Sequence, residues 1–179
     1  MVVQASLAQW NADLSAIERI AATTPLEWNG QVMRITRRSS DIQEQGLRVV
    51  AWAIRPIQGR NHWVRWQSPQ LRNLQEWRAA WESSLNRTLN ASTNTQETVQ
   101  QPATVLMPVQ NWQLQYFRGN SWSNPLSSGA SSGAIDPNNP TDVTLPDGVR
   151  LMLDLPAPGA LSGRLTQDWV NPLLGGNKS

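Results

Sequence analysis

The chain has 179 residues, of which 39% are hydrophobic and 16% are charged, and this length can bury one sizeable core. Fifteen Lys and Arg stand against thirteen Asp and Glu for a formal net charge of +2, and the basic residues are spread singly apart from Arg37 and Arg38. This spread argues against a nucleic-acid partner, because binding along phosphates needs a stripe of cations. The absence of cysteine excludes thiol catalysis, thiolate metal sites and disulfides. No stretch approaches the roughly 20 apolar residues that cross a bilayer, so we expect one soluble domain over residues 1–179.

Residues 2–22 have the periodicity of an amphipathic helix. The apolar positions, at alternating spacings of four and three, are Val3, Leu7, Trp10, Leu14, Ile17 and Ala21. Asn11, Asp13, Ser15 and Glu18 lie off this stripe, and Pro25 ends the pattern, so we predict a helix over residues 1–23. The pattern favours a helix that lies on a sheet. The alternative is that part of the stripe, especially toward Val3, faces a partner or belongs to a longer helix.

Extended segments follow the helix. In LEWNGQVMRIT, residues 26–36, Asn29-Gly30 predicts a hairpin with a two-residue type I′ turn. Residues 47–54, LRVVAWAI, are apolar enough for a central strand that ends at Arg55-Pro56, and we expect residues 62–67 to pair with it as a hairpin.

The stretch NHWVRWQS, residues 61–68, places two of the chain's ten tryptophans beside its single histidine and on either side of Arg65. Strand alternation places Trp63 and Arg65 on one face and His62, Val64 and Trp66 on the other. We therefore expect one tryptophan in the core and the other exposed. The segment is either structural, with an arginine over an aromatic face, or a platform on which a sugar or base stacks.

A second helix is predicted after residue 68, with two candidate starts. Ser68-Pro69 offers an N-cap and a first-turn proline, and Asn73 with Glu76 three residues later offers a capping pair. The apolar stripe of this helix is Leu74, Trp77, Trp81, Leu85 and Leu89.

The remainder of the chain is typical of strands and long loops. We predict flexible loops at about residues 90–102 and 127–142, a frayed tail at 175–179, and strands between them. Trp112, Leu114 and Tyr116 alternate with polar residues, and Val149, Leu151, Leu153 and Leu155 share one strand face. The fold class is therefore α+β, with an N-terminal amphipathic helix packed on antiparallel β-sheet over residues 26–170, a second short helix and long loops.

Catalytic and metal-binding signatures are absent from the sequence. His62 is the only histidine, no Gly-x-Ser-x-Gly elbow is present, and the carboxylates are scattered singly. The oxygen-bearing residues of IDPNNPTD, which are Asp136, Asn138, Asn139 and Asp142, depart from the calcium-loop pattern because prolines interrupt it and its glycine is missing. We predict no catalytic residue, no cofactor and no metal, and a protein that is not an enzyme.

The order of these segments resembles a known family. The most specific piece is WQLQYFRGNSW, followed after a loop by LPDGVRLMLDL, and it is preceded by LAQWNADLSAIERI, LEWNGQVMRITRRS and HWVRWQSP. This resembles minor pseudopilin J of the bacterial type II secretion system, a PulJ-like, prepilin-type protein. The resemblance covers most of the chain and implies a fold with an N-terminal helix against antiparallel β-structure.

The resemblance implies a structural role. Members of the family join the I-type and K-type minor pseudopilins in a heteromeric complex at the tip of a periplasmic pseudopilus, which supports export of folded proteins across the outer membrane. The major pseudopilin and the secreted cargo are further implied partners. Because helices pack side by side in such a filament, the resemblance implies that one helix stripe serves both packing within the chain and the partner interface. Its residues are Val3, Leu7, Trp10, Leu14 and Ile17.

The sequence departs from the family pattern at its start. Full-length pseudopilins open with a basic leader, a cleavage glycine, a methylated phenylalanine, a glutamate soon after it and a long apolar helix in the inner membrane. This chain begins at Met1 where the amphipathic half of that helix would lie. We therefore expect a periplasmic domain of a Gram-negative bacterium whose full-length form is anchored in the inner membrane, with membrane contact only through the missing N-terminal helix.

Two alternatives remain open from the sequence. A minor pilin of a type IV pilus-like system would share the fold and differ in its partners. A Trp-rich carbohydrate-binding module would use exposed Trp63, Trp66 or Trp122 as flat stacking surfaces.

Overall fold

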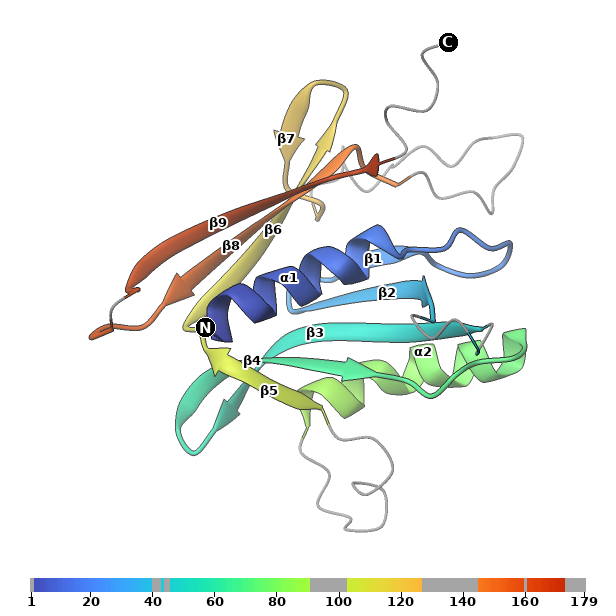
Figure 1. The fold of residues 1–179 in the computed structure, drawn as a ribbon, viewed down its shortest axis with the longest axis horizontal. Coiled ribbons are helices and arrows are strands. Elements are labelled where there is room, and N and C mark those ends of the chain that lie inside the picture. The colour runs from blue at the N-terminus through green and yellow to red at the C-terminus, as the bar shows by residue number, and fades with distance from the viewer. Residues whose placement is uncertain are drawn as a thin grey trace.

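The computed structural model describes residues 2–39, 43, 46–90, 103–126, 145–159 and 161–172. Within these ranges the chain forms two antiparallel sheets and two α-helices (Figure 1). Helix α1 lies between the two sheets, and helix α2 covers the opposite face of the first sheet. This confirms the predicted α+β class. Neither described helix is long and apolar enough to cross a membrane.

Helix α1 spans Val2–Ser15, so the predicted helix over residues 1–23 is wrong at its C-terminal end. The chain leaves the helix to pair with the first sheet, where Ile17 forms a β-bridge with Arg37. The Glu18 N–H donates to the Thr36 carbonyl at 3.0 Å, and the Arg38 N–H donates to the Ala16 carbonyl at 3.1 Å. These bonds satisfy the backbone in place of further helical turns. Helical periodicity cannot reveal such a competing pairing, because the partner strand lies elsewhere in the sequence.

The first sheet has the strand order β1-β2-β3-β4-β5. Its strands are β1 Leu26–Trp28, β2 Val32–Arg38, β3 Leu47–Ile57, β4 Arg60–Gln67 and β5 Thr104–Pro108. The β3–β4 hairpin confirms the predicted pairing of residues 47–54 with 62–67. Strand β3 continues past Pro56, however, because its pairing with β2 ends at Ala53, and a proline is tolerated where a strand has a neighbour on one side only.

The predicted type I′ turn is not found at Asn29-Gly30. The β1–β2 hairpin is present, but only Gly30 takes a positive φ, of 94°, so Asn29-Gly30 does not form a type I′ turn. The Asn29 side chain instead accepts the N–H groups of Gln31 and Val32, at 2.9 and 2.7 Å. The type I′ geometry lies in the β3–β4 turn, where Gln58 and Gly59 have φ of 50° and 78°.

The second sheet has the order β7-β6-β8-β9. Its strands are β6 Asn111–Arg118, β7 Ser121–Ser123, β8 Gly148–Leu155 and β9 Gly163–Val170. The alternation predicted here is confirmed, because the inner face of β6 and β8 carries the buried side chains Trp112, Leu114, Tyr116, Val149, Leu151, Leu153 and Leu155. The expected loops at 90–102 and 127–142 and the tail at 175–179 lie outside the described residues, apart from Asn90.

The main core lies between α1 and the inner faces of both sheets, and tryptophans dominate it. The Trp63 ring centroid is 4.4 Å from that of Trp52 and 5.9 Å from that of Trp112, and Trp112 contacts Trp28 edge to face at 4.8 Å. Such pairs add to the stabilisation that comes from burying their area. The aromatic richness of the sequence therefore serves mainly to hold the two sheets together.

Helix α2 spans Leu74–Leu89 and begins at the second of the two predicted starts. The Asn73 side chain accepts the Glu76 N–H at 2.8 Å, and the Glu76 carboxylate accepts the Arg72 N–H at 2.8 Å. Ser68-Pro69 is not a helix start, because the buried Ser68 hydroxyl accepts the Val49 N–H. Four residues of the predicted stripe pack on the sheet, with Trp77 buried and Trp81, Leu85 and Leu89 half-buried, whereas Leu74 is 38% exposed. Ala80, Ser84 and Thr88 are also buried, so the buried face is centred beside the predicted stripe.

Replacing Asn73 by Ala is expected to lower the free energy of unfolding by about 1 kcal/mol, because the Glu76 N–H loses its acceptor. Urea unfolding followed by circular dichroism measures this change. Replacing Asn90 by Ala at the other end of α2 is the matched control, since within the described residues the side chain of Asn90 bonds to exposed Asn86 alone. Equal effects of the two substitutions would contradict the assignment of Asn73 as the N-cap.

Candidate partner-binding surface

The five predicted interface residues all pack against the main core of the chain itself. Trp10 is 0% exposed and Leu14 is 1% exposed, whereas Val3, Leu7 and Ile17 are partly buried against the same core. Ile17 is not on the helix, since α1 ends at Ser15. The intrachain part of the predicted role is therefore met by all five residues, and only Val3, Leu7 and Ile17 keep surface that a partner could reach.

Apart from Val2 at its first position, the outward face of α1 consists of small and polar side chains. Its exposed residues are Val2, Gln4, Ala5, Ala8, Ala12 and Ser15. Alanine side chains on an exposed helix face leave the backbone accessible to close approach by another helix. We call this set, together with the half-buried Val3 and Leu7 at its margin, the outward face of α1.

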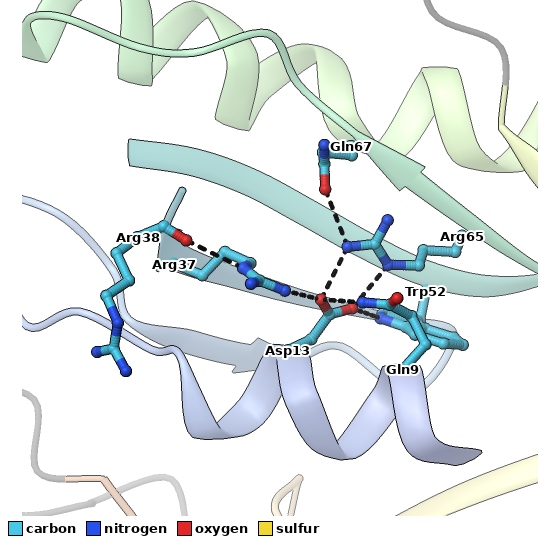
Figure 2. A network of polar contacts seen from close by, with 7 residues as sticks. All are labelled: Gln9, Asp13, Arg37, Arg38, Trp52, Arg65 and Gln67. Atoms are coloured by element: carbon cyan, nitrogen blue, oxygen red, sulfur yellow. Dashed lines mark hydrogen bonds and ion pairs between the residues drawn. The ribbon is translucent and has the colours of Figure 1, made fainter. Parts of the chain in front are cut away.

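Asp13 fixes α1 on the first sheet, although the sequence pattern placed it on the solvent side of the helix (Figure 2). Its carboxylate is 0% exposed. The Arg65 guanidinium donates to both carboxylate oxygens, at 2.7 and 2.8 Å, and the Trp52 indole N–H donates at 2.8 Å. The Gln9 amide donates at 3.0 Å, and Arg37 donates a further bond. A carboxylate with this many donors is fully satisfied in the protein interior, which burial requires.

The arginines of this network are themselves held in place. Arg37 donates through Nε to the Arg38 carbonyl at 3.1 Å, and Arg65 donates to the Gln67 side chain at 3.0 Å (Figure 2). One feature of the sequence could have revealed the buried position of Asp13: strand alternation placed Arg65 on the same face as the core residue Trp63. An arginine on a core face needs a buried anion, and Asp13 lies three residues after Trp10 on the helix that covers this face.

The tryptophans of the NHWVRWQS stretch do not form a stacking platform. Trp63 is 0% exposed in the main core, and Trp66 is 3% exposed on the opposite face of the sheet, so the expectation that one of them is exposed is wrong. The reason is α2, which covers the face that alternation left open for Trp66. The Arg65 guanidinium lies 5.9 Å from the Trp52 ring centroid, which agrees with the structural interpretation of the stretch.

Trp122 is half-buried on the outer face of the second sheet. Its ring lies over Gly148, where an added Cβ would come within 3.5 Å of it, and 5.1 Å from the Phe117 ring. The Arg150 guanidinium lies 4.1 Å from the Trp122 ring centroid. Of the three tryptophans considered as sugar-stacking surfaces, only Trp122 is accessible to a sugar. The Arg150 guanidinium already covers part of its ring.

The same outer face carries two arginine–aspartate pairs across neighbouring strands. Arg150 on β8 binds both carboxylate oxygens of Asp168 on β9, at 2.8 and 3.0 Å. Arg164 on β9 binds both oxygens of Asp154 on β8, at 2.9 and 3.4 Å. The hydrogen bonds from Arg164 hold the pKa of Asp154 below its ordinary value.

No arrangement for catalysis emerges within the described ranges. The His62 ring nitrogen Nδ1 lies 3.0 Å from the Arg60 carbonyl, and no group of three or more His, Asp and Glu in these ranges could hold a metal ion. The oxygen-bearing loop residues Asp136, Asn138, Asn139 and Asp142 lie outside the described residues.

Comparison with known proteins shows the fold. No protein-family model matches the chain, and no curated protein matches it in sequence. Among solved structures, the chain is similar to one from the crystal structure of the GspK-GspI-GspJ complex of the enterotoxigenic Escherichia coli type 2 secretion system. The TM-score is 0.52 and the sequence identity 15%, with 94% of each chain covered. The protein therefore has a pseudopilin-like fold along nearly its whole length.

Proposed function

We propose that this chain is the globular domain of a J-type minor pseudopilin of a type II secretion system. It joins other minor pseudopilins in a complex at the pseudopilus tip and so supports export of folded proteins across the outer membrane. The observation that carries the proposal is the fold similarity over 94% of both chains to a member of the GspK-GspI-GspJ complex. The order of sequence segments, which resembles the same class of protein, is independent support.

The geometry of α1 suits assembly through helices. The Asp13 network attaches one side of the helix to the first sheet. A mechanical force that acts on the helix during assembly is therefore transmitted to the rest of the domain. The outward face of α1 leaves Ala8 and Ala12 exposed, and small residues let two helix backbones approach closely. In this proposal Val3 and Leu7 contribute the apolar margin of the contact, while Trp10 and Leu14 support it from the core.

The location follows from the proposed function. The domain acts in the periplasm of a Gram-negative bacterium, and the full-length protein is held in the inner membrane by a helix that precedes α1. Its partners are the I-type and K-type minor pseudopilins.

The test is size-exclusion chromatography with light scattering on the domain mixed with soluble I-type and K-type domains from the same genome. A heteromeric complex is expected. Replacing Ala8 and Ala12 by Glu places two charges on the outward face of α1 and is expected to abolish the complex without unfolding the domain. Replacing Ala79 by Glu on the exposed side of α2 is the matched control and should leave the complex intact.

The outcome separates the related functions. Binding to minor pilins of a type IV pilus system in place of the I-type and K-type domains would assign the chain to that system. If the domain binds neither set of partners, or if the Ala79 variant fails as completely as the α1 variant, the proposed function or its interface is wrong.

A further inference from the structure

Among the described residues, strand β9 has no partner on its outer side and forms one edge of the second sheet (Figure 1). It pairs with β8 over eight residues in unbroken register, and the Asn171 N–H continues this ladder by donating to the Asp147 carbonyl at 2.8 Å. Hydrogen-bonded pairs alternate along an antiparallel ladder. The backbone groups that point away from β8 are therefore those of Arg164, Thr166, Asp168 and Val170.

These outward backbone groups are almost unoccupied. Within the described part of the chain, the only bond to them is a 3.4 Å donation from the Gln167 side chain to the Asp168 carbonyl. Two of the usual protections against pairing are missing from this edge, since β9 contains no proline and has no bulge, and its charged residues Arg164 and Asp168 have opposite signs. The opposite edge of the same sheet, β7, has only three residues.

We propose that β9 is a dimerisation edge, which pairs antiparallel with β9 of a second copy of this chain. The pairing is centred on Thr166, so that Thr166 lies opposite its own equivalent and Arg164 lies opposite Asp168 of the second copy. In this register, Arg164, Thr166 and Asp168 of each copy lie opposite one another across the contact. Their N–H and C=O groups, which point away from β8, can then form hydrogen bonds between the two copies. The two second sheets become one continuous antiparallel sheet, which buries the free edge of both copies.

Charge complementarity selects this register. Arg164 and Asp168 lie on the outer face, and each already pairs within its own chain, with Asp154 and Arg150. In the proposed dimer the row across the joined sheets reads Asp154, Arg164, then Asp168 and Arg150 of the second copy, with signs that alternate throughout. A slip of four residues in either direction would oppose Arg164 to Arg164 or Asp168 to Asp168, and like charges directly opposite are destabilising.

The test is sedimentation velocity of the domain over a wide concentration range. The wild-type chain is expected to shift from the mass of one chain to twice that mass as concentration rises. Replacing Thr166 by Pro removes an outward N–H, which an edge strand tolerates, and is expected to leave the domain folded and monomeric. Circular dichroism confirms folding of each variant.

A charge pair at the centre of the contact gives a second, independent test. Thr166→Lys and Thr166→Glu each oppose a charge to its own copy and should raise the dimer dissociation constant roughly fivefold or more, and an equimolar mixture of the two should restore dimer. Gln113→Lys and Gln113→Glu are the matched controls, because Gln113 lies in the same row of the outer face but two strands from the edge. They should leave the dissociation constant unchanged.

The result can overturn the proposal without bearing on the proposed secretion function, because no other pseudopilin is present. A wild-type chain that stays at the mass of one chain at every concentration excludes the dimer. A dimer that persists in Thr166→Pro, or that responds equally to the Gln113 variants, forms through another surface and excludes the β9 edge.

Discussion

Replacing Asp13 by Ala is expected to lower the free energy of unfolding by about 3 to 5 kcal/mol. The substitution removes the anion that Arg65, Arg37 and the Trp52 indole share, and it leaves two guanidinium groups at the buried helix–sheet contact without a counter-charge. Removing one partner of a buried ion pair costs more than the pair contributes, because the remaining charge stays desolvated. Urea unfolding followed by tryptophan fluorescence measures the loss.

A matched substitution separates burial from ion pairing. Asp154 also accepts hydrogen bonds from Nε and Nη2 of an arginine, but its pair with Arg164 lies at the surface, where solvent screens the charges. Asp154→Ala should therefore leave the unfolding midpoint nearly unchanged. Asp13→Asn should fall between the two, because an amide oxygen can still accept the Trp52 N–H. An Asp13→Ala variant as stable as the wild type would show that the network does not hold α1 on the sheet.

Replacing Trp10 by Ala is expected to cost about 3 to 5 kcal/mol of stability, the range for removing a fully buried aromatic side chain. The sequence alone allowed two outcomes, loss of stability or loss of partner binding. The structure favours the first, because Trp10 is 0% exposed beneath α1 in the main core. Its indole N–H has no hydrogen-bond partner in the described part of the chain, so the cost comes from lost packing and the cavity left behind.

Trp122→Ala is the control for this prediction. Trp122 is half-buried at the surface of the second sheet and leaves no enclosed cavity when it is removed. We expect a clearly smaller change in the unfolding midpoint than for Trp10→Ala. If Trp10→Ala retains wild-type stability and instead loses the complex with I-type and K-type domains, the residue is a partner contact and its position in the core is wrong.

Local pattern determined much of this fold from the sequence. Alternation on β6 and β8 identified the buried faces correctly, because most apolar residues of each strand lie on one face, with Phe117 and Met152 as the exceptions. The start of α2 at Asn73 was also readable, since capping depends on residues within one turn of each other. Trp10 and Leu14 were assigned to a buried helix face from helical periodicity, which is also a local pattern.

Tertiary contacts decided the features that local pattern could not. The end of α1 at Ser15 depends on pairing with β2, the burial of Trp66 depends on α2, and the burial of Asp13 depends on arginines from β2 and β4. In each case the partner that decides the structure is distant in the sequence. The pattern of residues around each position therefore does not reveal that partner. The sequence by itself therefore determined that two helices and a set of antiparallel strands form and which strand faces are apolar, but not where α1 ends. Only the tertiary structure decided which polar residues lie inside, because a buried charge is stable only where the fold brings its partners to it.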